Sequence, residues 1–240
     1  FGKSLTSKER DEWYSLQKIL RQDWVESSLS DLEQEEPDDL MMHPLRLALE
    51  VQSLMNQNDW LVIDGGNTHF WSEIAVNMAG AQGKELAGIL HPGSFSMLGV
   101  GVSFGLAAKL NHPKDRVVVI SGDGAFLSGG LSIEAAFQEN VPITVVIDNN
   151  GGLTTISQQQ ERLFADERHV ATDFRDIPFH SMFEGMGGHG ELVEKPEDLK
   201  PALERALSTG RTACVNVRTR SAISPIVLAT TSKRDKASIE

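Results

Sequence analysis

Five short apolar runs, separated by segments of helical length, constrain the fold more than any other feature of this sequence. They read WLVID, RVVVIS, ITVVID, GELVE and ACVNV. Runs that are apolar throughout and rich in β-branched residues are typical of parallel strands buried on both faces, with helices as the crossovers. The sequence therefore predicts an α/β fold over about residues 40–220, with a doubly wound, mostly parallel sheet and helices on both faces.

A helical extension precedes this region. Residues 6–29 are predicted to form an amphipathic helix, because Thr6 and Glu9 have the spacing of a capping box. Apolar residues follow at helical spacing: Trp13, Leu16, Leu20 and Trp24. We therefore expect one long helix that carries an apolar stripe.

The acidic stretch DLEQEEPDD is typical of a linker, and Pro44 after it occupies the favoured first position of a new helix. These signals divide the chain into three parts. The expected parts are an N-terminal helix with an acidic linker (1–40), a main α/β domain (41–225) and a polar C-terminal tail (226–240).

Charge and cysteine content limit the partners and the compartment. The formal net charge of −12 argues against a nucleic-acid-binding surface and against binding to anionic membranes. The apolar runs are all shorter than the roughly 18 residues that a membrane span needs. The single cysteine, Cys214, lies in the apolar run TACVNV, where a core position is expected. We expect a cytoplasmic protein with no nucleic-acid or membrane partner.

Three polar, glycine-rich loops follow the ends of predicted strands: DGGNTH, GDGA and DNNGG. Either of the last two alone is an ordinary turn signal. In open parallel sheets, however, ligands bind in the crevice outside the carboxyl ends of the strands. We therefore expect the three loops to converge on one site.

The pair Asp123 and Asn150 points to the chemistry of that site. The two residues lie 27 positions apart, with a helix-like segment and a strand between them, which is a complete βαβ unit. Carboxylate and amide oxygens suit Mg²⁺, which usually completes its coordination with water and ligand phosphates. The neighbouring glycines allow backbone N–H groups to approach a phosphate, and the helix after Ala125 offers its positive N-terminus. The spacing predicts a metal–diphosphate site.

The stretch GDGAFLSGGLSIEAAFQENVPITVVIDNNGG resembles the thiamine-diphosphate (ThDP) motif, which begins with GDG and ends with NN. The resemblance extends through DGGNTHFW, HPGSFSMLGVGVSFGLAAKL and VEKPEDLKPALERALSTG, and so covers roughly residues 40–225. The chain is similar to the C-terminal, diphosphate-binding domain of the acetolactate synthase, oxalyl-CoA decarboxylase and 2-hydroxyacyl-CoA lyase group. This resemblance implies an enzyme that makes or breaks a carbon–carbon bond next to a carbonyl, with ThDP and Mg²⁺ as cofactors.

The resemblance also implies roles for particular residues. Mg²⁺ would be bound by the side chains of Asp123 and Asn150 and by the backbone oxygen of Gly152. The residues expected to line the cofactor are Gly66, Asn67, Thr68, Ser96, Leu98, Gly122, Gly124 and Ala125. Among these, Leu98 would lie beneath the cofactor and hold it bent, while the backbone of Ser96 and Leu98 would bind its aminopyrimidine ring.

No residue of this chain is assigned as catalytic. In the family, a glutamate of a separate pyrimidine-binding domain activates the cofactor, and these 240 residues contain no counterpart of that domain. We therefore expect the chain to be the C-terminal part of a longer enzyme or the smaller subunit of a split one. It would act as a homo- or hetero-oligomer and be inactive alone.

Four histidines near these motifs remain open to interpretation. His69 is a candidate for substrate contact, or for a structural hydrogen bond beside the diphosphate loop. His91 is a second candidate for substrate contact, whereas His180 and His189 are expected to be surface or packing residues. No group of His and Cys residues has zinc-site spacing.

Three functional readings stay open. NNGG resembles the branch of the family that cleaves CoA esters, which points to a 2-hydroxyacyl-CoA or oxalyl-CoA substrate. DGGNTHFW and SAISP resemble the acetolactate synthase branch, a carboligase of 2-keto acids. The third reading is a non-catalytic cofactor-binding or regulatory subunit, and the intact Asp123, Asn150 and Gly152 count against it.

Overall fold

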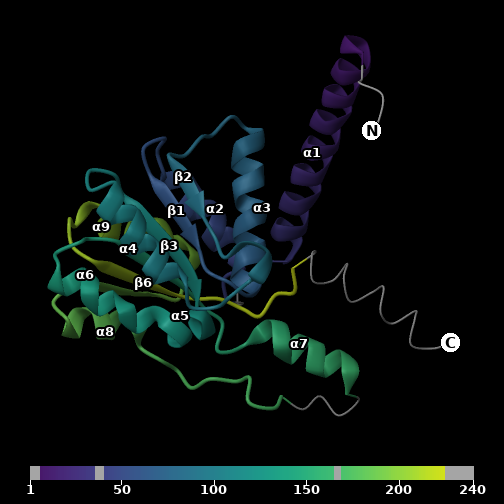
Figure 1. Cartoon of the computed structure of the whole chain (residues 1–240). Helices are drawn as coiled ribbons and strands as arrows, with labels where there is room; N and C mark the ends of the chain where they lie inside the picture. Colours follow the sequence, from purple (N-terminus) through teal and green to yellow (C-terminus); the bar gives the residue numbers. More distant parts are fainter. Residues whose placement is uncertain (1–5, 36–40, 165–168, 225–240) are drawn as a thin grey trace.

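The structure is a computed structural model that describes residues 6–35, 41–164 and 169–224 (Figure 1). The predicted C-terminal tail and the end of the acidic linker lie outside the described residues. Within the described residues, no helix is both long enough and apolar enough to cross a membrane.

A single six-stranded sheet, parallel throughout, forms the centre of the fold. Its order is β2-β1-β3-β4-β6-β5. The strands are β1 (Trp60–Ile63), β2 (Gly88–Leu90), β3 (Val117–Gly122), β4 (Thr144–Asn149), β5 (His189–Val193) and β6 (Ala213–Arg218). All five predicted strands are confirmed. The short edge strand β2 was not predicted, because its three residues are partly or fully exposed and form no apolar run.

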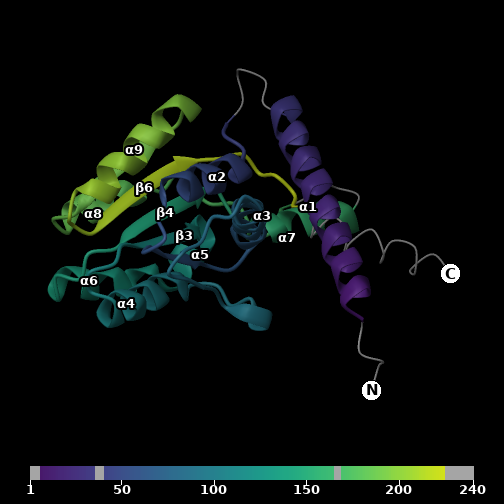
Figure 2. The same ribbon diagram turned by 90° about the horizontal axis from the view of Figure 1, so that it is seen from above.

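Helices cover both faces of the sheet, as a doubly wound fold requires (Figure 2). They are α2 (Pro44–Leu54), α3 (Asn67–Ala81), α4 (Gly101–Asn111), α5 (Asp123–Gly129), α6 (Glu134–Gln138), α7 (Thr154–Leu163), α8 (Phe179–Gly185) and α9 (Pro196–Ser208), with 3₁₀ turns η1 (Gly93–Phe95) and η2 (Gly130–Ile133). The predicted α/β fold class is therefore confirmed.

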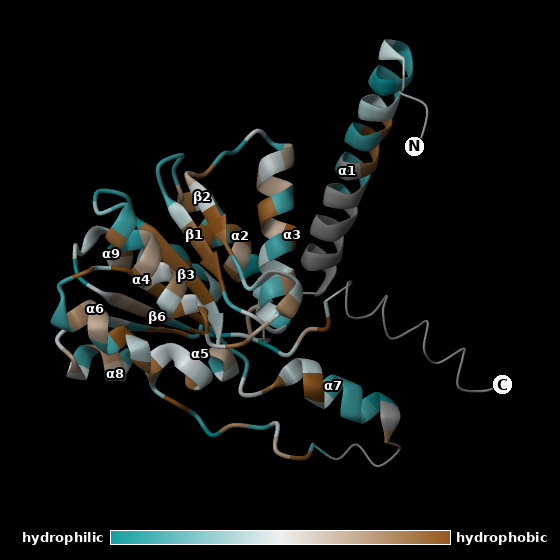
Figure 3. Ribbon diagram, viewed as in Figure 1, coloured by the Kyte–Doolittle hydropathy of each residue, from teal (hydrophilic) through white to brown (hydrophobic). Residues whose placement is uncertain are grey.

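The core is split into two layers by the alternation of side chains along the strands. On β3, Val118 and Ile120 pack on the side of α2 and α9, while Val117 and Val119 pack on the side of α4, α6 and α8. Cys214 is fully buried in the second layer, as expected. The strands β1 and β3 are accordingly among the most apolar parts of the ribbon (Figure 3).

The N-terminal helix α1 (Ser7–Glu35) extends six residues beyond the predicted end. Its capping box is confirmed, since Thr6 N–H donates to Glu9 and Glu9 N–H donates to the Thr6 hydroxyl. Three members of its predicted apolar stripe are not buried, since Trp13, Leu16 and Leu20 are each about half exposed. The side chain of Trp24, the fourth member, lies outside what the structure describes. The helix lies alongside α3, away from the sheet (Figure 1).

The segment after GDG is not one continuous helix, contrary to the prediction. It is divided into α5, the 3₁₀ turn η2 and α6. The break coincides with Gly129 and Gly130, and the backbone of Gly129 lies against Gly99: a Cβ on Gly129 would be 2.1 Å from the Gly99 oxygen. This close approach joins the end of α5 to the loop that carries Leu98.

Candidate functional site

A pocket of about 290 Å³ opens at the carboxyl ends of β1, β3 and β4. Its lining residues are Gly65, Gly66, Asn67, Thr68, His69, Phe70, Ser96, Leu98, Gly122, Asp123, Gly124, Ala125, Asn150, Gly152, Leu153, Thr154, Thr155 and Ile156. Every candidate site residue predicted from the sequence is among them except His91. The three predicted loops thus converge on one site.

Three helices begin at this pocket, and each directs its N-terminus toward it. The first turns of α3, α5 and α7 all contribute lining residues. The first N–H groups of a helix have no intrahelical partner, and the helix dipole places partial positive charge there. The pocket is therefore suited to an anion such as a phosphate.

Asp123 is the buried carboxylate of the pocket, with 2% of its surface exposed. Its Oδ1 accepts from the N–H of Gly124 at 2.7 Å, and its Oδ2 accepts from the N–H groups of Gly151 and Gly152 at 2.8 and 2.9 Å. Burial nevertheless raises the pKa of Asp123 to about 7, which means that three backbone hydrogen bonds do not compensate for its desolvation. A cation at this position would supply the missing compensation.

Three buried side-chain oxygens of the pocket have no hydrogen-bond partner among the described residues. They are Oδ1 of Asn150, Oδ1 of Asn67 and Oγ1 of Thr155. Buried polar atoms without a partner are uncommon and costly, so each calls for a group that is not a protein side chain. Asn150 lines the same pocket as Asp123 and directly precedes Gly151 and Gly152, whose N–H groups donate to the Asp123 carboxylate. This donor set fits a Mg²⁺ ion.

A buried hydrogen-bond network fixes the floor of the pocket. Asp148, at the end of β4, accepts from the hydroxyls of Thr68, at 2.6 Å, and Thr219. Burial raises the pKa of Asp148. These bonds hold the first turn of α3 against the end of β4, so the loops after β1 and β4 keep a fixed spacing.

Asp64, at the end of β1, positions the third loop. Its Oδ1 accepts from Gly65 N–H at 2.8 Å and Gly99 N–H at 2.9 Å, and its Oδ2 accepts from the Ser121 hydroxyl at 3.0 Å. One carboxylate therefore ties the loop that carries Leu98 to the ends of β1 and β3. Asp64 was not predicted as a site residue, because it is the last residue of the apolar run WLVID, which was interpreted as a strand.

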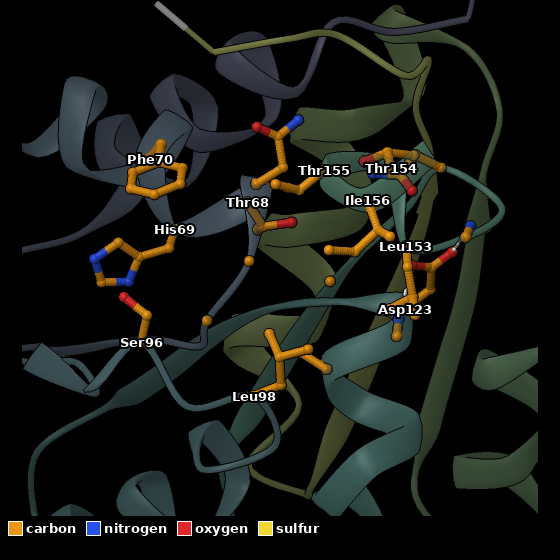
Figure 4. Close-up of a pocket in the computed structure, with 18 residues that line it drawn as sticks. Thr68, His69, Phe70, Ser96, Leu98, Asp123, Leu153, Thr154, Thr155 and Ile156 are labelled. Carbon is orange, nitrogen blue, oxygen red and sulfur yellow. Dashed lines mark hydrogen bonds between the residues drawn. The ribbon is translucent and has the colours of Figure 1, made fainter. Parts of the chain in front are cut away.

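Leu98 and Ser96 both line the pocket. A Cβ on Gly65 would meet Leu98 Cδ2 at 3.0 Å, so the leucine packs directly against the first glycine loop. Ser96 has a φ of 46°, in the left-handed region. Figure 4 shows Ser96 and His69 at one end of the pocket, Asp123 at the other and Leu98 between them.

The histidines separate into two groups. His69 is buried, lines the pocket and contacts Glu73 Oε1 through its Nε2 at 2.9 Å. The ring of His91 lies 5.3 Å from that of His69, between centroids, but His91 does not line the pocket. His180 and His189 are not lining residues; they contact Asn216 and Glu191.

Sequence reasoning missed the first turn of α7, including Leu153, Thr154, Thr155 and Ile156. DNNGG was interpreted only as a turn that carries metal ligands. The available signal was the pair of threonines that follows it, because threonine is frequent at helix starts.

Comparison with known proteins identifies the family. Residues 64–217 match the family model described as thiamine pyrophosphate enzyme, C-terminal TPP binding domain. A probable acetolactate synthase of Mycobacterium bovis is 35% identical over 199 residues, covering 81% of this chain and 35% of the relative. The 2-hydroxyacyl-CoA lyase 2 of Mus musculus is 30% identical over 174 residues, covering 72% of this chain and 26% of the relative.

The chain thus spans about a third of the length of the acetolactate synthases that it matches. The matched region contains all three strand-end loops and every predicted cofactor and metal ligand position. The chain belongs to the thiamine pyrophosphate enzyme family and carries its C-terminal TPP-binding domain.

Proposed function

We propose that this chain supplies the diphosphate- and metal-binding part of a ThDP-dependent enzyme that makes or breaks a carbon–carbon bond next to a carbonyl. One observation carries the proposal: the buried carboxylate of Asp123 shares one pocket with the Asn150 side-chain oxygen, which has no hydrogen-bond partner among the described residues, and three helices begin at that pocket. That arrangement suits an anion and a cation together, which is the requirement of a magnesium diphosphate.

In this proposal the side chains of Asp123 and Asn150 and the backbone oxygen of Gly152 bind Mg²⁺. Backbone N–H groups of the loops after β1 and β3 bind the diphosphate. The residues that contribute to these two loops are Gly66, Asn67, Thr68, Gly122, Gly124 and Ala125. ThDP, when bound, supplies an electron sink for carbon–carbon bond chemistry.

The remaining pocket residues position the reactive end of the cofactor. Leu98, packed on the first glycine loop, supports the bent cofactor from below, and the backbone of Ser96 and Leu98 binds the aminopyrimidine. Asp64 holds this loop in place relative to the sheet by accepting a hydrogen bond from Gly99 N–H. The chain's own contribution is therefore binding, orientation and exclusion of water.

The activating glutamate is proposed to come from a pyrimidine-binding domain on another chain or on a segment outside this sequence. In the part of the chain that the structure describes, none of the residues lining the pocket is a glutamate. A site completed by a second polypeptide or domain requires an assembly of at least two such units.

For the substrate, we favour a 2-keto acid over an acyl-CoA. The relative named acetolactate synthase is more similar and covers more of this chain than the relative named 2-hydroxyacyl-CoA lyase 2, at 35% over 81% against 30% over 72%. The 2-hydroxyacyl-CoA lyase reading is the second candidate, supported by the NNGG loop.

The test is a turnover assay on the complete enzyme, loaded with ThDP and Mg²⁺. Pyruvate and a 2-hydroxyacyl-CoA are offered separately, and products are followed by mass spectrometry. We expect a carboligation product from pyruvate. Cleavage of the CoA ester alone would favour the second candidate, and no turnover with either substrate despite bound ThDP would support a non-catalytic subunit.

A further inference from the structure

Three side chains with metal-binding chemistry meet at the rim of the pocket, away from the predicted Mg²⁺ ligands. His69 and Glu73 are four positions apart on α3 and therefore lie on the same face of that helix. His91 follows β2, which the sheet brings alongside β1. One ligand atom from each residue lies within 4.8 Å of the other two.

His69 is the anchor of this cluster. Only 6% of its surface is exposed, and its Nδ1 is buried with no hydrogen-bond partner among the described residues. Its Nε2 lies 2.9 Å from Glu73 Oε1. Glu73 is partly exposed and His91 is exposed, so the cluster is closed on the α3 side and open toward solvent.

We propose that His69, Glu73 and His91 form a binding site for a borderline divalent transition metal, of which Zn²⁺ is the probe of choice. Two imidazoles and one carboxylate are ligands that zinc prefers, while Mg²⁺ prefers oxygen ligands. Three protein ligands leave a coordination position for water or for a substrate oxygen, as in catalytic zinc sites. The sequence did not predict this site because its ligands come from two separate segments.

The three ligand atoms would have to shift before they could bind one zinc ion. Ligands at about 2.1 Å from a tetrahedral ion lie about 3.4 Å from one another, so the ion draws the cluster together. His91 is the exposed member and follows the end of an edge strand, and its Nδ1 accepts from the Gly93 N–H at 3.2 Å, so its ring would turn toward the other two ligands about a side chain that faces solvent. The Nε2–Oε1 contact between His69 and Glu73, at 2.9 Å, is shorter than that spacing, so these two atoms would move apart by about 0.5 Å and exchange their hydrogen bond for bonds to the ion.

The proposed zinc site adjoins the cofactor pocket. His69 also lines the cofactor pocket, and Figure 4 places it next to Ser96, at the end opposite Asp123. An ion bound by His69 would lie at the end of the pocket away from the proposed diphosphate. The proposal does not depend on the proposed enzymatic function, because it concerns zinc binding by side chains outside the Asp123–Asn150 site.

The experiment is a calorimetric titration of the chain with Zn²⁺ in excess Mg²⁺, which occupies the oxygen-ligand site. We expect a single class of tight zinc sites, weakened at least about tenfold in His91→Asn and in Glu73→Gln. Co²⁺, titrated in the same way, should give visible absorption bands that both variants lose. Circular dichroism checks the fold of each variant.

The matched control is His169→Asn. His169 contacts Glu161 at 2.6 Å and Asp173 at 3.1 Å. These three residues form another group of a histidine and carboxylates that could compete for zinc. We expect this variant to bind zinc like the wild type. The proposal is overturned if the wild type shows no zinc binding above Mg²⁺, or if zinc binding is lost in His169→Asn and kept in His91→Asn.

Discussion

At the scale of single residues, Asp123 determines the chemistry of the pocket. Its pKa is raised from 3.8 to about 7 by burial, even though three backbone N–H groups bind it. Three pKa units correspond to about 4 kcal/mol between the protonated and ionised forms. A cation offsets that cost, so the same feature that destabilises the metal-free fold favours metal binding.

The raised pKa predicts how the stability of the metal-free chain depends on pH. Because the folded-state pKa exceeds the unfolded value, the contribution of Asp123 is fully present below about pH 4 and is lost as the pH rises through about 7. We expect the free energy of unfolding to fall over that window by an amount on the order of 4 kcal/mol from this residue. Urea unfolding across the window, with EDTA present, measures it.

Asp123→Asn is the control, since it cannot titrate. Asp148 also has a raised pKa and contributes in the same direction. The difference between wild type and variant in the slope of the free energy of unfolding against pH therefore isolates the contribution of Asp123. Equal slopes in the two proteins would show that Asp123 is ionised without cost and would remove the basis for its assignment.

At the scale of elements, the pocket depends on how closely two glycine-containing segments meet. Gly129 at the end of α5 touches Gly99, which Asp64 holds from the opposite side. The loop that carries Leu98 is thus fixed between β1 and α5. No other amino acid fits at position 129, because a Cβ there would lie 2.1 Å from the Gly99 oxygen.

Gly129→Ala is therefore predicted to destabilise the fold by about 1–3 kcal/mol, since an added methyl forces backbone apart. It should also weaken ThDP binding by displacing Leu98. Gly80→Ala, in helix α3 with no atom within 4 Å of the added Cβ, is the matched control and should be neutral or slightly stabilising. Chemical denaturation of both variants makes the comparison; a neutral Gly129→Ala would disprove the close contact.

Most of the helices and strands could be predicted from the sequence, because parallel strands buried on both faces appear in it as continuous apolar runs. The edge strand β2 and the break after α5 could not. β2 exists only through pairing with β1, and the break follows from a contact with Gly99, which is distant in sequence. The role of Asp64 also depends on residues distant in sequence, Gly99 and Ser121, so the sequence predicted the loops of the pocket but not this role.

At the scale of the whole molecule, we propose that the chain is one part of a larger catalytic unit. It spans about a third of the length of its relatives. Among the described residues, no glutamate lines its pocket. Apolar side chains such as Phe95, Met97 and Leu127 remain exposed on the pocket loops or just beyond them, and those of α1 are about half exposed. These features are consistent with a pocket completed by another domain.

We therefore predict that the purified chain, supplied with ThDP, Mg²⁺ and pyruvate, shows no turnover until a pyrimidine-binding domain is added. The physical reason is that activation of the cofactor would need a glutamate carboxylate, whereas among the described residues that line the pocket the only carboxylate is that of Asp123, the proposed metal ligand. Product formation with and without the added domain tests this. Robust turnover by the chain alone would contradict the need for a second domain.

The most direct test of the central claim is a calorimetric titration of the chain with ThDP, with and without Mg²⁺, for the wild type and Asp123→Asn. We predict binding that requires Mg²⁺ and that the substitution weakens by at least about 3 kcal/mol, roughly a hundredfold or more, because it removes the charged ligand of a buried ion. Equal affinity for ThDP in the two proteins, or equal affinity with and without Mg²⁺, would contradict the claim that Asp123 holds a metal–diphosphate.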